Sequence, residues 1–112
     1  MRAAGAGIGA FFTPTSANTK LGEGKESRII NDKEYVLEYP LKGDIALILA
    51  KQADRLGNVI YDKSARNFSP IMAMAATNTI VQVEEIVALG DMDPELIMTP
   101  GIFVDRVFVH TL

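Results

Sequence analysis

One apolar run constrains the fold of this 112-residue chain more than any other feature. Residues 44–50 are apolar after the first position, and Gly43 and Lys51 bound the segment. A continuous apolar run of this length is typical of a strand covered on both faces, as central strands of parallel sheets are. We therefore predict a central strand in a parallel sheet. A piece of such a fold would expose apolar sheet surface and associate.

The first third of the chain predicts loops followed by a hairpin. Residues 5–15 are rich in glycine and read as a turn-rich loop, and the polar residues 16–26 read as a surface loop. Residues 28–39 then predict two short strands around a polar turn, with Leu37 on the same strand face as two tyrosines, Tyr35 and Tyr39.

The rest of the chain alternates strand signals with short helical ones. Ser69-Pro70 predicts a helix start, because proline is favoured at the first helical position. The other expected elements are a strand at 58–61, a β-rich stretch at 79–83, an ambiguous stretch at 84–89, a helical turn capped by Asp93, and a strand at 104–109. These elements favour an α/β fold, part of an open and mostly parallel layered sheet. Without an internal linker, residues 1–112 form a single domain or part of one.

Composition and charge exclude several classes of function. The net charge of −3 and the scattered distribution of the eleven Lys and Arg leave no basic stripe for nucleic acid. No apolar run approaches the roughly 20 residues of a membrane span, and the first residues are too short and glycine-rich for a secretory signal, so we expect a cytoplasmic protein. The absence of cysteine means that any nucleophile is an oxygen or a nitrogen.

Three closely spaced glycines, Gly5, Gly7 and Gly9, leave three interpretations open. They fit a tight loop with closely packed backbone, a loop lining a neighbouring active site, or a phosphate cradle. Their spacing does not match the dinucleotide fingerprint, and no P-loop lysine follows, which weighs against the phosphate cradle.

The stretch 64–68 is the most informative about function, because a guanidinium (Arg66), an amide (Asn67) and an aromatic ring lie together just before a helix start. The arginine and asparagine either satisfy loop carbonyls in a tight corner or contact a ligand or subunit. His110 has no second histidine to form a metal site or triad, so it reads as a strand-end residue. Glu84 and Glu85, on opposite faces of a strand, read as solvated or locally paired.

Four sequence blocks in order resemble the alpha (A) subunit of family I 3-oxoacid CoA-transferases. They are GAGIGAFFTPTS, KEYVLEYPLKGDIALILAKQADRLGNVIYDKSARNFSPIMAMAA, TIVQVEEI and DPELIMTPGIFVDRVFV. The resemblance implies an open α/β fold, a partner beta (B) subunit, and an active site between the two. It also implies coenzyme A thioesters and small carboxylic acids as substrates, with no separate cofactor and no metal.

The same resemblance implies ping-pong chemistry through a glutamyl-CoA thioester on the beta subunit. No glutamate of this chain matches that motif, so no catalytic residue is assigned here. The residues expected near the substrate or the subunit interface are Gly7, Gly9, Phe11, Thr13, Thr15, Arg66 and Asn67.

The resemblance covers the C-terminal half of such a subunit, without its N-terminal glycine-rich strand-to-helix turn. An incomplete gene, a misplaced start or a deliberately shortened chain would each explain a start at Met1. The sequence departs from the family at residues 9–11 and 16–19. Two alternatives stay open: a non-catalytic fragment that only binds or scaffolds a beta subunit, and a sugar-phosphate isomerase on a similar sheet.

Overall fold

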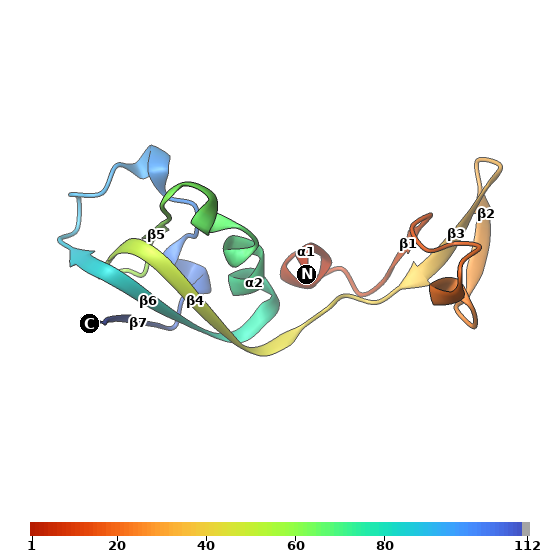
Figure 1. Cartoon of the computed structure of the whole chain (residues 1–112), viewed down its shortest axis with the longest axis horizontal. Coiled ribbons are helices and arrows are strands. Elements are labelled where there is room, and N and C mark those ends of the chain that lie inside the picture. The colour runs from red at the N-terminus through yellow and green to blue at the C-terminus, as the bar shows by residue number, and fades with distance from the viewer. Residues whose placement is uncertain (111–112) are drawn as a thin grey trace.

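The computed structural model, which describes residues 1–110, contains two β-sheets at opposite ends of an elongated molecule (Figure 1). A three-stranded sheet has the order β1-β3-β2, and a four-stranded sheet has the order β5-β4-β6-β7. The molecule measures 53 × 26 × 23 Å, with a radius of gyration of 17.8 Å. A compact domain of this length has a radius of about 13 Å. The chain is therefore markedly extended.

The smaller sheet is antiparallel and confirms the predicted hairpin. Strands β2 (Ser27–Ile30) and β3 (Lys33–Glu38) pair directly. Asn31 and Asp32 join them with positive φ angles of 49° and 62°. Two consecutive positive φ angles are typical of the type I′ turn, which Asn and Asp tolerate well. The local chemistry of the turn thus sets the pairing of these strands.

One expectation for this region is wrong in part. Strand β1 (Phe11–Thr13) forms inside the expected loop, because its backbone pairs with the free edge of β3. The buried residue of β3 is Val36, on the face opposite Leu37, whereas Tyr39 is 71% exposed. Val36 lies between Thr13 of β1 and a residue of β2, so its central position in the sheet shields it.

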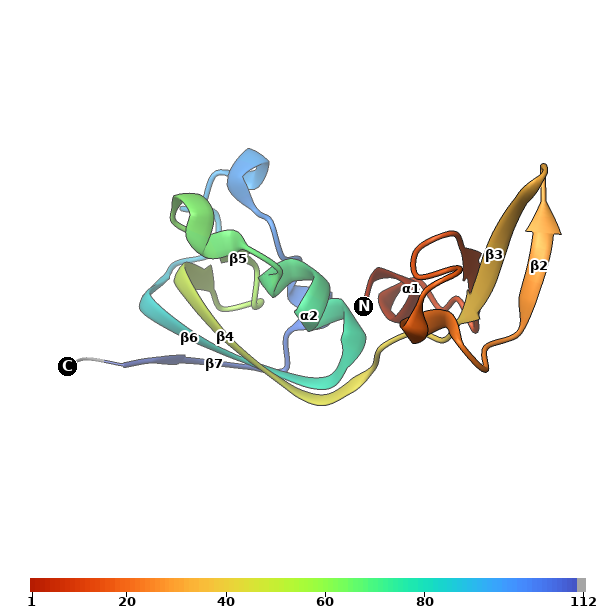
Figure 2. The same ribbon diagram turned by 45° about the vertical axis from the view of Figure 1, so that its right-hand side comes forward.

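The larger sheet confirms that the apolar run forms a strand in parallel pairing, although only Gln52 and Ala53 of that strand meet a described neighbour on its other edge. Strand β4 (Gly43–Asp54) pairs in parallel with β6 (Ala76–Val87), which pairs in parallel with β7 (Arg106–Val109). The short strand β5 (Val59–Ile60) joins the other side of β4 in antiparallel orientation (Figure 2). The stretch 84–89, for which the sequence was ambiguous, is strand as far as Val87. Strand β6 pairs with β4 up to the last residue of β4.

The helices are short, and two of their predicted starts are confirmed. Helix α2 (Ser69–Ala75) has its proline in the first turn, and Asp93 caps η3 by accepting a hydrogen bond from the Glu95 backbone N–H at 3.0 Å. The remaining helices are α1 (Arg2–Gly5) and the 3-10 turns η1 (Lys20–Gly22), η2 (Lys63–Arg66), η3 (Pro94–Leu96) and η4 (Gly101–Phe103). Within residues 1–110, no helix has the length and apolar character needed to cross a bilayer.

The core lies on one face of the larger sheet, under α2. Small and branched side chains fill it: Ala46, Ile48, Ala50, Ala53, Val59, Ala73, Val81 and Val83. Met72 packs against this cluster, as expected of an adaptable core side chain. Met74 instead faces α1, where an added Cβ on Gly5 would lie 2.6 Å from the Met74 Cβ.

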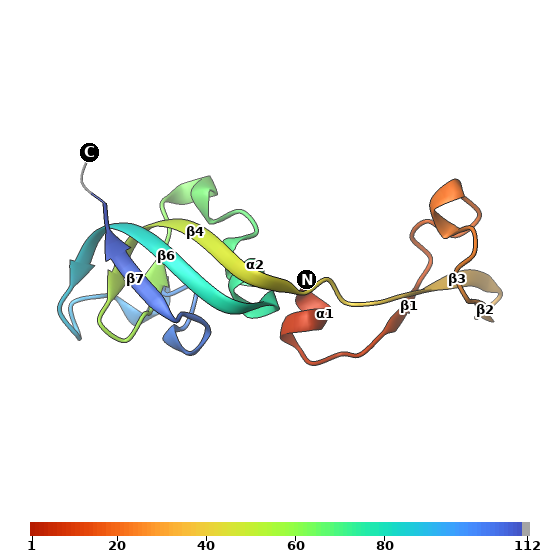
Figure 3. The ribbon, with the colours of Figure 1, turned by 90° about the horizontal axis from the view of Figure 1, so that it is seen from below.

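No element within residues 1–110 covers the opposite face of the larger sheet. Ile45, Leu47 and Leu49 alternate with the buried residues of β4 and are 60%, 72% and 63% exposed. Figure 3 looks onto this sheet from below, with no helix in front of β4, β6 and β7. The exposed face agrees with the expectation that a piece of such a fold exposes apolar sheet surface, because α2 packs on the other side only.

Candidate functional site

A tight corner between η2 and α2 carries the two polar residues singled out from the sequence. Arg66 ends η2, and Asn67 follows with φ 40° and ψ −128°. Residues with a side chain rarely adopt this backbone conformation, which costs on the order of 1–3 kcal/mol. The Asn67 backbone N–H donates to the Ser64 carbonyl oxygen at 3.1 Å. Backbone strain of this kind clusters at functional sites, so the corner is our first candidate.

Arg66 lines a small basic hollow. Its Nη1 lies 3.1 Å from the Met98 Sδ, and the hollow encloses about 270 Å³. Lys51 and Lys63 also line it. Both ion pairs found within residues 1–110 belong to the smaller sheet and its adjoining loop, so neither neutralises these three cations. The hollow is therefore suited to an anionic group such as a phosphate or carboxylate.

Tyr61 forms a wall of the same hollow as a neutral phenol. Its Oη lies 2.7 Å from the Thr99 Oγ1, within hydrogen-bonding distance. Burial raises the pKa of Tyr61 above its ordinary value, and the Thr99 hydrogen bond opposes part of that rise. Thr99 is itself fully buried. The Tyr61 side chain is thus held in place and protonated at neutral pH.

An apolar hollow of about 490 Å³ lies on the other side of the corner and brings two sequence blocks together. Phe11, from the glycine-rich segment, and Phe68, directly after Asn67, both line it, along with Ile8 and Ile71. Phe11 and Phe68 are 38% and 56% exposed. Sequence spacing gives no sign that these two aromatic residues, more than fifty positions apart, share one hollow.

The other residues predicted from the glycine-rich block do not line the basic hollow: Gly7 and Gly9 lie in the connection from α1 to the smaller sheet, whereas Thr13 ends β1 and Thr15 follows it. Gly7 has a φ of 73°, yet an added Cβ at Gly7 or Gly9 would meet nothing within 4 Å. Close backbone packing is therefore the wrong interpretation for these two glycines. The Thr13 Oγ1 accepts a hydrogen bond from the Thr15 backbone N–H at 3.2 Å, which stabilises the turn after β1.

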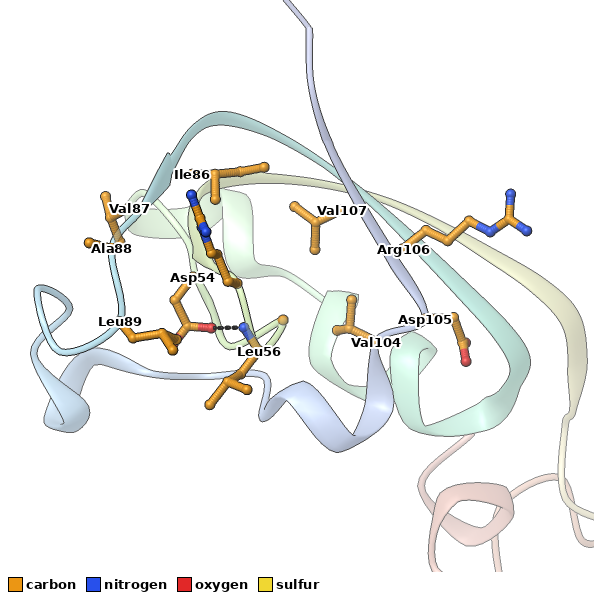
Figure 4. A pocket seen from close by; sticks show the side chains of 12 residues that line it. Asp54, Leu56, Ile86, Val87, Ala88, Leu89, Val104, Asp105, Arg106 and Val107 are labelled. Carbon is orange, nitrogen blue, oxygen red and sulfur yellow. Dashed lines mark hydrogen bonds between the residues drawn. The ribbon is translucent and has the colours of Figure 1, made fainter.

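A hollow of about 920 Å³ was not predicted (Figure 4). It lies between the turn after β4 and the ends of β6 and β7, and its walls combine apolar side chains with charged ones, among them Arg55 and Arg106. Its two carboxylates are already engaged: the Asp54 Oδ1 accepts from the Leu56 backbone N–H at 2.9 Å, and the Asp105 Oδ2 accepts from the Thr79 backbone N–H at 2.7 Å. These acids hold loops in place.

Asp54 is the structural residue that sequence reasoning missed. It is 6% exposed, and its carboxylate also accepts from the backbone N–H and the Nδ2 of Asn58, at 3.0 and 2.8 Å. The signal was present, because Asp followed by Gly57 and Asn58 is typical of a side-chain-stabilised turn.

The remaining titratable groups fit their expected roles. The Glu85 Oε2 accepts a hydrogen bond from the Gln52 Nε2 at 2.8 Å, and Glu84 is exposed beside it. His110 is exposed just beyond β7. Within residues 1–110, no three His, Asp or Glu side chains gather in a way that would hold a metal ion.

Comparison with known families matches nearly all of the chain. A family model described as coenzyme A transferase covers residues 1–110. The A subunit of 3-oxoadipate CoA-transferase from Pseudomonas putida is 62% identical over 94% of this chain and 46% of the relative. The A subunit of succinyl-CoA:3-ketoacid coenzyme A transferase from Helicobacter pylori is 50% identical over 96% of this chain and 47% of the relative. The chain thus spans about half the length of these relatives.

Solved structures share the fold. An acyl-CoA transferase from E. coli O157:H7, determined as a thioester complex with CoA, superimposes with a TM-score of 0.84 at 22% identity. The alignment covers 97% of this chain and 25% of that protein. The open α/β fold predicted from the sequence is confirmed by this likeness.

Proposed function

Because this chain belongs to the coenzyme A transferase family, we propose that it forms part of the A subunit of an enzyme that moves coenzyme A between two carboxylic acids. The identity of 62% over 94% of the chain with the A subunit of a 3-oxoadipate CoA-transferase is the observation that carries this proposal. We propose succinyl-CoA as a donor and a short-chain or 3-oxo acid as the acceptor.

The proposed covalent step takes place on the partner B subunit. A glutamate carboxylate there attacks the acyl-CoA thioester and displaces the CoA thiolate, which forms a mixed anhydride. The thiolate then attacks the glutamyl carbonyl of that anhydride and releases the first acid, so that coenzyme A is held as a glutamyl thioester. The second acid takes up coenzyme A by the same two steps in reverse, which frees the glutamate. Three acids in or beside the larger sheet are already engaged in hydrogen bonds within this chain. Asp54 and Asp105 are committed to backbone donors, and Glu85 is hydrogen-bonded to Gln52.

The proposed role of this chain is to bind and position. Coenzyme A carries phosphates and the exchanged acids carry carboxylates, so the three cations around the basic hollow, Lys51, Lys63 and Arg66, supply complementary charge. The backbone conformation of Asn67 sets the direction in which the chain turns from η2 into α2. The exposed ring of Phe68 offers an apolar contact at the subunit interface.

A hybrid protein tests this function directly. The matching segment of the Pseudomonas putida A subunit is replaced by residues 1–110 of this chain, and the hybrid is co-expressed with the B subunit of that enzyme. Transfer of coenzyme A from succinyl-CoA to 3-oxoadipate is then measured. We expect turnover, because the segment would supply the same fold and the same basic hollow.

Two controls sharpen the result. The 112-residue chain alone is expected to show no turnover, because no nucleophilic glutamate is assigned to it. A hybrid that folds and binds the B subunit, yet transfers no coenzyme A, would contradict the catalytic proposal and support a purely scaffolding role. Turnover by the purified chain alone would contradict the placement of the nucleophile on the partner.

A further inference from the structure

Met98 is the most exposed of the five methionines, and its sulfur lies beside the guanidinium of Arg66. The side chain is 39% exposed, and its Sδ lies 3.1 Å from the Arg66 Nη1. A thioether sulfur is a weak hydrogen-bond acceptor, so this contact holds the guanidinium only loosely. The Met98 side chain therefore meets both solvent and a cation of the basic hollow.

The backbone on either side of this sulfur is held in place. The Met98 N–H donates to the Val59 carbonyl oxygen at 3.1 Å, and the Val59 N–H donates to the Thr99 carbonyl oxygen at 2.9 Å. The Thr99 side chain is in turn hydrogen-bonded to Tyr61. A chemical change at the Met98 sulfur would therefore act on the hollow that the side chain lines and leave the backbone in place.

The methionines of α2 and of the loop before η3 lie in different surroundings. Met72 packs against the core of the larger sheet, Met74 lies against α1, and Met92 is 7% exposed. Oxidation makes a flexible apolar side chain polar, which disrupts packing wherever the side chain is buried. An exposed methionine takes up an oxygen atom without that loss, and this favours Met98 as a site of reversible oxidation.

We propose that Met98 is a modification site, at which hydrogen peroxide oxidises the thioether to a sulfoxide and so lowers the affinity of the basic hollow for anions. The sulfur lone pair attacks one peroxide oxygen, which forms the S–O bond and breaks the O–O bond. The departing hydroxide takes the proton of the new S–OH group and leaves as water, so the sulfur is oxidised and the peroxide is reduced. This regulation rests on the proposed function, which assigns anion binding to the hollow.

The new oxygen atom accounts for the direction of the effect. Because Arg66 already lies 3.1 Å from the sulfur, the sulfoxide oxygen comes within reach of the guanidinium donors. A hydrogen bond from a charged donor is roughly twice as strong as one between neutral groups, so the guanidinium is drawn to the sulfoxide and away from a bound anion. The oxygen also brings partial negative charge into a hollow of about 270 Å³. Lys51 and Lys63 remain, so the affinity falls but is not abolished.

Peroxide treatment of the 112-residue chain tests the site, with inorganic pyrophosphate as the probe. Peptide mass spectrometry follows the oxidation of each methionine, and calorimetry measures the Kd for pyrophosphate before and after treatment. We expect Met98 to be oxidised ahead of Met72, Met74 and Met92. The Kd should rise about tenfold, as the loss of one hydrogen bond from a charged donor implies. Reduction by methionine sulfoxide reductases should restore the original Kd.

Three variants assign the effect to this sulfur. Met98→Leu keeps an apolar side chain without sulfur, so peroxide should leave its Kd unchanged. Met98→Gln places an amide oxygen close to where the sulfoxide oxygen would lie, and should raise the Kd without peroxide. The matched control is Met92→Leu, which keeps the Met98 sulfur and should respond to peroxide as the wild type does. Circular dichroism checks that each variant is folded.

Removal of the guanidinium tests the coupling between the two side chains. Arg66→Gln should weaken pyrophosphate binding by itself, and oxidation of Met98 should then cause no further loss. An unchanged Kd after oxidation of Met98 in the wild type would overturn the proposal. So would an equal loss of affinity in peroxide-treated Met98→Leu, or a failure of the untreated chain to bind pyrophosphate.

The Kd for pyrophosphate is measured without turnover, which separates this inference from the proposed function. If the hybrid protein transfers no coenzyme A but the Kd of the chain rises when Met98 is oxidised, only the catalytic proposal is contradicted. If the hybrid turns over and the Kd of the chain does not change on oxidation, only the regulatory site is contradicted.

Discussion

The Asn58 side chain joins two loops that lie 43 residues apart, because its Oδ1 accepts a hydrogen bond from the Gly101 backbone N–H at 2.9 Å. The Nδ2 of the same side chain donates to the Asp54 Oδ2 at 2.8 Å. Asn58 thus uses both ends of its amide, and the turn after β4 is held against η4. Residues 54–57 of this turn line the hollow of about 920 Å³.

Replacing this amide with a carboxylate tests the bridge. Asn58→Asp keeps the acceptor for Gly101 but removes the donor to Asp54 and places two carboxylates side by side. We expect a loss of about 1–3 kcal/mol in the free energy of unfolding, measured by urea denaturation. Asn18→Asp, at an exposed loop position with positive φ, is the matched control and should change stability little. Equal stability of the two variants would contradict the bridging role.

The contact of α1 with α2 depends on the absence of a side chain at Gly5. A Cβ there would lie 2.6 Å from the Met74 Cβ, so Gly5→Ala forces the two helices apart. Overpacking of this kind costs about 1–3 kcal/mol. Thermal unfolding measures the loss, with Gly9→Ala as the control, because a Cβ at Gly9 meets nothing within 4 Å. A stable Gly5→Ala variant would show that α1 moves freely away from α2.

The strained backbone of Asn67 predicts opposite responses to two substitutions. Asn67→Gly removes the conformational penalty and should preserve or raise the thermal stability of the chain, whereas Asn67→Ala keeps the strain and should lower it by about 1 kcal/mol. In the hybrid enzyme, both variants should raise the KM for acyl-CoA, because both lack the amide. An unchanged KM in both would exclude the amide from ligand or interface contacts.

We expect Arg66 to hold in place the corner between η2 and α2 and the contact with the partner subunit. We do not expect it to take part in bond making. In the hybrid enzyme, Arg66→Lys should weaken assembly or raise the KM for acyl-CoA, because an ammonium group cannot reproduce the planar donors of guanidinium. Formation of the glutamyl-CoA thioester should survive. Sedimentation and trapping of the thioester measure the two effects. Intact assembly and KM with no trapped intermediate would instead require a direct role in the transition state.

Ionisation of Tyr61 should lower the free energy of unfolding at alkaline pH. Burial raises its folded-state pKa above that of the unfolded chain, so the folded state binds the phenolic proton more tightly. Its contribution is fully present below about pH 10 and is lost as the pH rises through the folded-state pKa. Urea denaturation between neutral and alkaline pH should show a steeper loss of stability for the wild type than for Tyr61→Phe. Parallel curves would contradict this, and Tyr39→Phe, at an exposed tyrosine, is the control.

Local chemistry in the sequence determined the elements whose signals lie within a few residues. The Asn31-Asp32 turn and the Ser69-Pro70 helix start were predicted, because backbone preferences at these positions are set by the residues themselves. The apolar run likewise predicted that β4 is a strand in parallel pairing, and the order of the four sequence blocks predicted the family.

Only the tertiary structure decided which distant residues meet and which faces are covered. Phe11 and Phe68 share a hollow, and Asp54 is buried among backbone donors, because long-range packing brings separate segments together. The alternation along β4 predicts two faces but does not say which one α2 covers. The exposed Ile45, Leu47 and Leu49 show the physical reason: burial of a strand depends on the layers around it, and its own residues determine only which side chains share a face.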